Sequence, residues 1–249
     1  MLKRPKEVQC EFKQPPAPYP PSHRSGAMIG PSGVGKTTTC IAMLMGPYKN
    51  CYERVYIFSP SCTAGVDAAW DAWRKHVRIH MKVPDEERTM FDQWEPDKLE
   101  QILERHKKVN ALLKSKKQTK GYAICVVVDD FADSGDKVMH SSTNVLTSLF
   151  VRGRHLGCAC WLLSQKLRVI SLICRTNFCW MMVWRMRNAK ELSSLMEELS
   201  AILPIKTLHQ MYKMATQNKH DFWYINLLNE TDAMFFRNFD QRFALNLDT

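Results

Sequence analysis

The segment MIGPSGVGKTTTC, residues 28–40, matches the pattern G-x-x-x-x-G-K-[ST], which is typical of loops that bind nucleotide phosphates. Glycines without a Cβ atom allow successive backbone N–H groups to curl around the β- and γ-phosphates, and the helix expected after the loop points its dipole at the same anion. Lys36 is expected to reach the terminal phosphates, and the hydroxyl of Thr37 to bind Mg²⁺. The expected phosphate-contacting residues are Gly30, Pro31, Ser32, Gly33, Val34, Gly35, Lys36, Thr37 and Thr38.

Composition places the chain among ordinary globular proteins. Of its 249 residues, 45% are hydrophobic and 24% are charged. No apolar run approaches the roughly 20 residues that span a bilayer, and the basic N-terminus has no apolar core of a secretion signal, so we expect an intracellular protein that requires no membrane. The nine cysteines include no C-x-x-C pair and are expected to be reduced core residues.

Alternating strand and helix patterns predict one α/β domain with a central, mostly parallel sheet flanked by helices. Residues 1–24 are basic and rich in proline, which predicts an extended tether before a nucleotide-binding domain at residues 25–249. Within this domain we expect a helical insert at about residues 61–121. Its residues Trp70 and Trp73 are interpreted as core residues, with a base-stacking platform as the alternative. A C-terminal β-hairpin is expected at about residues 222–239.

The segment AICVVVDD, residues 123–130, reads as a strand that ends in two carboxylates. Its continuous apolar run is typical of a central parallel strand buried on both faces, and ligands of open α/β sheets bind at the carboxyl ends of such strands. We expect Asp129 to hold Mg²⁺, directly or through water. Asp130 is expected to lean toward the γ-phosphate and to polarise the attacking water. The alternative is that Asp130 only begins the following turn.

A second apolar strand, CACWLL at residues 158–163, ends in Ser164 and Gln165. A polar side chain in this place can contact both the γ-phosphate and the attacking water, which would let Gln165 sense hydrolysis. Upstream, LFVRGRHLG predicts a glycine-punctuated turn that carries Arg152 and Arg154. Unpaired arginines are unfavourable inside a subunit, whereas on its surface they are free to enter the site of a neighbouring subunit.

The net charge of +10 comes partly from clusters. Residues 105–120 contain no Asp or Glu, and their cations predict a surface for the phosphate backbone of nucleic acid; the alternative is a solvated helix face. These cations are Arg105, Lys107, Lys108, Lys114, Lys116, Lys117 and Lys120. A second, weaker cluster is formed by Lys3, Arg4 and Lys6.

The order of the phosphate loop, Asp129-Asp130, GRHLG, Ser164-Gln165 and CRTNFCWMMVWR resembles the poxvirus-type genome-packaging ATPases of large DNA viruses and related virus-like transposons, within the FtsK–HerA superfamily. The resemblance covers roughly residues 25 to 240. It implies a P-loop NTPase of the additional-strand type, in which the Gln165 strand lies between the phosphate-loop strand and the acidic strand. It also implies hydrolysis of ATP with Mg²⁺ by a motor that packages double-stranded DNA.

The resemblance further implies Gln165 as the sensor and an arginine that acts between subunits of a homo-oligomeric ring of about five or six chains. Arg154 is favoured for this finger, with Arg152 and Arg175 as alternatives. A viral capsid vertex protein is the implied further partner, and the implied location is the host cell, in the virion or at its assembly site.

Three other classes of protein share parts of this pattern. A monomeric P-loop nucleotide kinase, or another small-molecule phosphotransferase, fits the length, with the helical insert as its lid, and its turnover would be unaffected by DNA. A terminase needs a nuclease domain, yet little more than a hairpin is expected after Ala215. A non-enzymatic switch is disfavoured by Asp130 and Gln165, because nucleotide binding alone needs neither of them.

Overall fold

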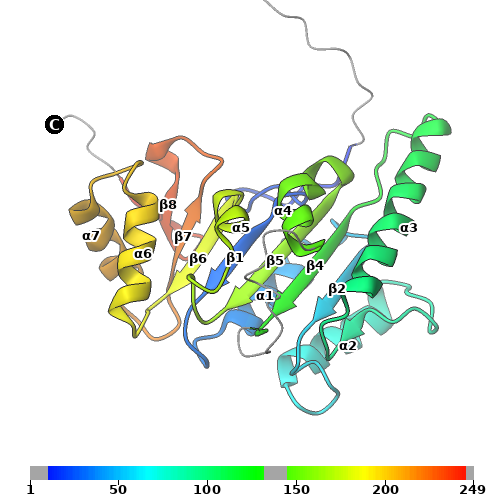
Figure 1. The fold of residues 1–249 in the computed structure, drawn as a ribbon, viewed down its shortest axis with the longest axis horizontal. Coiled ribbons are helices and arrows are strands. Elements are labelled where there is room, and N and C mark those ends of the chain that lie inside the picture. Colours follow the sequence, from blue (N-terminus) through cyan, green and yellow to red (C-terminus); the bar gives the residue numbers. More distant parts are fainter. Residues whose placement is uncertain (1–10, 132–144, 245–249) are drawn as a thin grey trace, which may run out of the picture.

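The computed structural model describes residues 11–131 and 145–244, which form a nine-stranded sheet covered by helices (Figure 1). The strands are β1 (Gly26–Ile29), β2 (Arg54–Phe58), β3 (Met90–Phe91), β4 (Ile124–Asp129), β5 (Cys158–Ser164), β6 (Trp180–Trp184), β7 (Phe222–Asn226), β8 (Phe235–Arg237) and β9 (Gln241–Arg242). The helices are α1 (Lys36–Met45), α2 (Ala68–His80), α3 (Pro96–Ser115), α4 (Val145–Leu156), α5 (Leu172–Thr176), α6 (Ala189–Leu199), α7 (Ile205–Ala215) and the 3₁₀ turn η1 (Thr231–Ala233).

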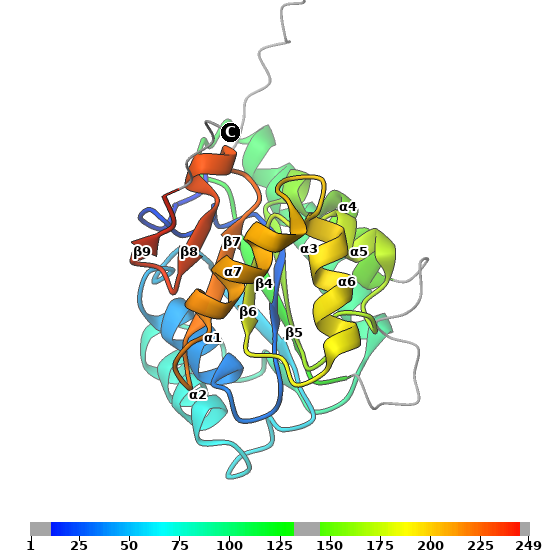
Figure 2. The ribbon, with the colours of Figure 1, turned by 90° about the vertical axis from the view of Figure 1, so that its left-hand side faces the viewer.

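The strand order is β3-β2-β4-β5-β1-β6-β7-β8-β9. The strands from β3 to β6 pair in parallel, and β7, β8 and β9 continue the sheet antiparallel at one edge (Figure 2). β5 lies between the phosphate-loop strand β1 and the acidic strand β4, and the expected hairpin is formed by β7 and β8. The predicted additional-strand fold is therefore confirmed. The sequence did not predict β3 and β9, because two residues are too few to show a strand pattern.

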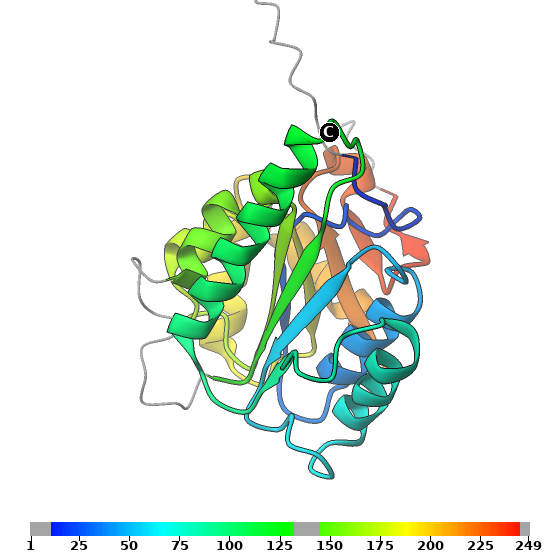
Figure 3. The same ribbon diagram turned by 90° about the vertical axis from the view of Figure 1, so that its right-hand side faces the viewer.

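Helices cover both faces of the sheet (Figure 3). α1 and α2 pack on one face, and α3 to α7 pack on the other. The residues of β4 alternate between these layers: Val126 and Val128 belong to the core under α3 to α7, whereas Cys125 and Val127 belong to the core under α1 and α2. Because both faces are buried, the strand is apolar at every position.

The two helices expected between residues 61 and 121 are present as α2 and α3. α2 begins after Asp67, whose side chain accepts a hydrogen bond from the backbone N–H of Ala69 at 2.8 Å, an N-cap that the sequence allows. Trp70 and Trp73 are fully buried, which confirms their interpretation as core residues.

α3 buries Leu99, Ile102, Leu103 and His106, as its spacing predicts. Leu112, further along the same helix, is 54% exposed. The C-terminal turns of α3 extend beyond the sheet and have no core to cover (Figure 1).

The described part of the proline-rich segment, residues 11–24, packs on the domain. The hydroxyl of Tyr48 donates to the carbonyl of Pro20 at 2.6 Å, and that of Tyr224 donates to the carbonyl of Pro18 at 2.9 Å. Proline carbonyls remain strong acceptors outside any strand, so buried tyrosines can hold the segment in place. The cations Lys3, Arg4 and Lys6 lie outside the described residues.

Candidate nucleotide-binding site

The phosphate loop joins β1 to α1 in the conformation that its glycines predict. Gly33 has φ +76° and Gly35 has φ +103°, both left-handed, and a Cβ atom placed on Gly33 would meet no atom within 4 Å. Gly35 is the N-cap of α1, and no side chain caps the helix, so its first N–H groups are free for an anion. Gly30 and Lys36 are buried, Ser32, Gly33 and Thr38 are exposed, and Pro31, Val34, Gly35 and Thr37 are half-buried.

Lys36 holds the loop closed from inside. Its ammonium donates to the carbonyl oxygens of Gly30 at 2.7 Å and Pro31 at 3.0 Å. Burial lowers the pKa of Lys36, and the nearby carboxylates of Asp129 and Asp130 oppose this effect by favouring the charged form. The loop therefore curls around a fixed positive charge, an arrangement that fits the terminal phosphates of a nucleoside triphosphate.

Asp129 ends β4 beside the loop and is only 4% exposed. Burial raises the pKa of its carboxyl from the usual 3.8 to about 6, although a hydrogen bond from Ser59 and the charge of Lys36 favour the anion. The Ser59 hydroxyl donates to Oδ2 of Asp129 at 3.0 Å. A buried carboxylate whose charge is only partly compensated fits a hard divalent cation, for which Thr37 at the start of α1 offers a second oxygen ligand.

Ser59 is a site residue that the sequence analysis missed. It follows the apolar strand β2 directly and is fully buried. The available signal was a polar residue at the carboxyl end of a central parallel strand, the same signal that identified Asp129 and Gln165.

Asp130 and Gln165 meet at this edge of the sheet. The Gln165 amide donates to Oδ1 and Oδ2 of Asp130 at 3.0 and 3.1 Å. Asp130 has a left-handed backbone with φ +55°, so it leaves the strand and points away from the direction that a regular strand would give it. The backbone N–H of Asp130 donates to the carbonyl of Leu163 at 3.2 Å, and that of Gly30 donates to Ser164 at 3.1 Å. The expected acid, sensor and phosphate loop are thus brought together.

Arg152 and Arg154 lie at the other end of β5. They belong to the last turns of helix α4, so the turn expected for them is wrong. Gly153 lies inside the helix, where a Cβ atom would be 2.7 Å from the carbonyl oxygen of Cys158. The glycine therefore allows the helix to lie close to the start of β5 and does not break the helix. Both arginines are exposed, and neither forms an ion pair with a carboxylate of the described residues.

The third arginine considered, Arg175, is held within the subunit. Its Nε donates to the carbonyl of Ile170 at 3.0 Å, and its guanidinium pairs with Glu198. Only 17% of its side chain is exposed. Arg175 would have to break these contacts to reach another subunit, which Arg152 and Arg154 need not do.

The expected basic surface is formed by α3 and the residues after it. All seven cations are exposed: Arg105, Lys107, Lys108, Lys114, Lys116, Lys117 and Lys120. Lys107 pairs with Glu104, and Lys120 lies 3.8 Å from Glu53. Lys114, Lys116 and Lys117 have no carboxylate partner within residues 11–131 and 145–244. These three are available to an anionic partner.

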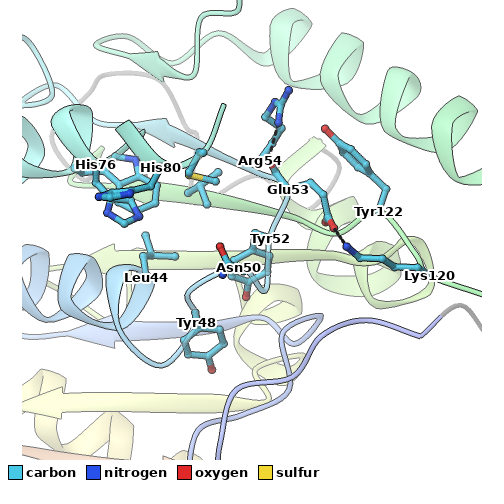
Figure 4. Close-up of a pocket in the computed structure, with 13 residues that line it drawn as sticks. Leu44, Tyr48, Asn50, Tyr52, Glu53, Arg54, His76, His80, Lys120 and Tyr122 are labelled. Atoms are coloured by element: carbon cyan, nitrogen blue, oxygen red, sulfur yellow. Dashed lines mark hydrogen bonds and ion pairs between the residues drawn. The ribbon is translucent and has the colours of Figure 1, made fainter. Parts of the chain in front are cut away.

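A cavity of about 280 Å³ lies away from this chemistry (Figure 4). Glu53 and Arg54 at the start of β2 line it together with His76, His80 and Lys120. The amino ends of the parallel strands form this part of the sheet, whereas the phosphate loop lies at their carboxyl ends. The cavity therefore belongs to neither the loop nor the two acids.

The fold and the site define a P-loop NTPase of the additional-strand type. The family model described as "Poxvirus A32 protein" matches residues 23–245. The chain therefore belongs to this family, which confirms the resemblance seen in the motifs. No curated protein matches the sequence of the chain.

Solved structures share the fold at low sequence identity. The genome packaging NTPase B204 of Sulfolobus turreted icosahedral virus 2, in complex with ATP-gammaS, is 13% identical with a TM-score of 0.53, over 84% of this chain and 95% of B204. The pCW3 conjugation coupling protein TcpA with ATPgS is 15% identical with a TM-score of 0.53, over 92% of this chain and 62% of TcpA. EssC (ATPases 2 and 3) of Geobacillus thermodenitrificans is 17% identical with a TM-score of 0.51, over 70% of this chain and 34% of EssC.

Proposed function

We propose that this chain is an ATP-driven motor that moves double-stranded DNA and packages a viral genome into a capsid. The observation that carries the proposal is the contact of Gln165 with Asp130 beside a phosphate loop. A protein that only binds nucleotide needs the loop and one acid, whereas a second acid in contact with a polar sensor serves hydrolysis. Membership of the Poxvirus A32 protein family supports the same conclusion.

In the proposed reaction, the backbone N–H groups of the loop and the ammonium of Lys36 bind the β- and γ-phosphates of ATP. Thr37 and Asp129 would hold Mg²⁺, which neutralises charge on the phosphate oxygens when bound. Asp130 orients the attacking water and accepts its proton. Gln165 reports the state of the γ-phosphate because the same amide that contacts Asp130 can contact a phosphate oxygen.

Arg154 is proposed to complete the site of a neighbouring subunit. It precedes β5, whereas Gln165 follows the same strand. A strand of seven residues spans roughly 20 Å, so Arg154 is too far from its own phosphate loop to act there. Its exposure and its lack of an ion pair in the described residues favour action between subunits. This role requires a ring, for which five or six subunits are proposed from the family resemblance.

The DNA partner is proposed from the exposed cations of α3, which contact phosphates without reading base sequence. A capsid vertex protein is the proposed further partner, in the host cell where virions assemble. In the described residues no helix has the length and apolar character needed to cross a bilayer.

The test is ATP turnover of the purified chain with and without duplex DNA, combined with a mass measurement of the assembly. A motor should form an oligomer and hydrolyse ATP faster when DNA is present, and Lys36→Ala should abolish hydrolysis both with and without DNA. A monomer whose turnover ignores DNA, and which phosphorylates a small molecule, would establish the kinase alternative instead.

A further inference from the structure

The connection between α7 and β7 contacts the phosphate loop through His220. Nδ1 of His220, in this connection, is 3.2 Å from the carbonyl oxygen of Val34. A carbonyl oxygen only accepts hydrogen bonds, so the contact assigns the hydrogen to Nδ1 of the imidazole. The two residues are 186 positions apart in the sequence, and nothing in the motif of the loop points to this partner.

The backbone of His220 is itself fixed by β6. The indole N–H of Trp184 donates to the carbonyl oxygen of His220 at 3.2 Å. Trp184 is fully buried and also packs against the start of the loop, since a Cβ atom placed on Gly30 would be 2.8 Å from its Cβ. Trp184 and His220 therefore support the loop at both Gly30 and Val34.

This contact also bears on the direction of the next backbone N–H of the phosphate loop, that of Gly35. The peptide that joins Val34 to Gly35 is planar and trans, so its carbonyl and its N–H point in opposite directions. A donor that holds the Val34 carbonyl therefore also fixes the direction of the Gly35 N–H, on the opposite side of the same peptide. Gly35 has φ +103° and no side chain of its own to define this orientation.

We propose that His220 is a positioning residue of the nucleotide site, which orients the Gly35 N–H toward the phosphates of ATP through its hydrogen bond to Val34. The inference rests on the proposed ATP-binding function of the loop. Because the Gly35 amide contacts a phosphate before and during hydrolysis alike, the loss of His220 should weaken nucleotide binding and raise KM, with little change in kcat.

The test compares His220→Ala, His220→Asn and His220→Gln in the full chain, with an ATP analogue carrying a fluorescent group on the ribose as the probe. The amide nitrogen of Asn takes the place of Nδ1, whereas that of Gln takes the place of Nε2. We expect His220→Ala and His220→Gln to bind the probe about 3- to 10-fold more weakly, the range for one lost neutral hydrogen bond. His220→Asn should bind like the wild type. His80→Ala, at the exposed end of α2, is the matched control.

Two results would overturn the inference: equal affinity of His220→Ala and the wild type, or equal behaviour of the Asn and Gln variants. The comparison of Asn with Gln remains decisive if His220→Ala does not fold. Lys36→Ala separates this inference from the proposed function. If Lys36→Ala binds the probe normally, the phosphate loop is not the nucleotide site; if it loses binding while His220→Ala does not, only the role of His220 is wrong.

Discussion

The amide of Gln165 donates to both carboxylate oxygens of Asp130, at 3.0 and 3.1 Å, across two neighbouring parallel strands. The left-handed backbone of Asp130 makes this contact possible, because it turns the side chain away from the regular direction of β4. The contact joins the proposed base of the hydrolysis reaction directly to its proposed sensor.

Asp130→Asn should keep ATP binding and lower kcat by about 10² or more, because the amide cannot accept the proton of the attacking water. Binding and single-turnover hydrolysis are measured separately. Gln165→Ala provides the comparison: it should also spare binding while reducing hydrolysis or its stimulation by DNA. Normal turnover of Asp130→Asn would remove Asp130 from the role of base.

Ser59→Ala should shift the acidic limb of the pH–rate profile to higher pH. The Ser59 hydrogen bond favours the Asp129 anion, so its loss raises the pKa of Asp129 further above about 6 and leaves less carboxylate at a given pH. The deficit in turnover should therefore be larger at pH 6.5 than at pH 8.5, both chosen as rough test points around this pKa. Ser59→Thr keeps the hydroxyl and is the control. A deficit that does not depend on pH would show that Ser59 acts only through packing.

Asp129→Asn should stabilise the protein at neutral and alkaline pH when Mg²⁺ and nucleotide are absent. The native pKa of about 6 lies above the unfolded value of about 3.8, so the native state binds its proton more tightly. The stabilisation that this bound proton gives to the native state is complete below the unfolded pKa and is lost as the pH rises through about 6. The difference between the native and the unfolded pKa of Asp129 corresponds to about 3 kcal/mol of folding free energy, an order-of-magnitude figure. Urea unfolding at several pH values should show the advantage of Asp129→Asn growing from pH ~4 to pH ~8. A constant difference would contradict the pKa assignment.

Replacing Lys114, Lys116 and Lys117 by Glu should weaken duplex binding and make it less sensitive to salt. Each phosphate contact releases condensed counterions and contributes a slope of about −0.9 to log K against log[salt]. The loss of three contacts should reduce the slope by roughly 2 to 3. Charge reversal of Lys49, Lys75 and Lys82, which lie outside the basic surface, is the matched control. Equal slopes for the wild type and for the variant of Lys114, Lys116 and Lys117 would show that these cations form only a solvated surface.

Arg154→Ala should bind ATP yet be nearly inactive, because an arginine finger contributes about 10³ to 10⁵ in turnover. Lys36→Ala should also be inactive, but because its phosphate loop no longer binds ATP well. In mixed rings, a Lys36→Ala subunit can present its intact Arg154 to the intact loop of an Arg154→Ala subunit, so hydrolysis should partly return. Recovery is measured across mixing ratios, with mixed assembly verified by mass. No recovery in mixed rings would exclude Arg154 and direct the same experiment to Arg152.

Short-range patterns predicted most of the elements that form this protein. The phosphate loop, the buried strand before Asp129 and the core tryptophans of α2 follow from residues close together in the chain. They could be predicted because hydrophobic periodicity and glycine spacing are properties of one segment. The helical position of Arg154 could not be predicted in this way. The neighbouring Gly153 indicated a turn, whereas it lies inside a helix and allows the helix to approach Cys158 closely, which only the tertiary structure shows.

The sequence by itself determined that the chain has a phosphate loop, two consecutive acids and a polar strand end, and the motif order indicated their family. Tertiary structure alone decided which of these groups touch. Ser59 meets Asp129 across 70 residues, and His220 meets Val34 across 186. Such contacts depend on the order of strands in the sheet, which results from the packing of all elements together, and no local pattern records it.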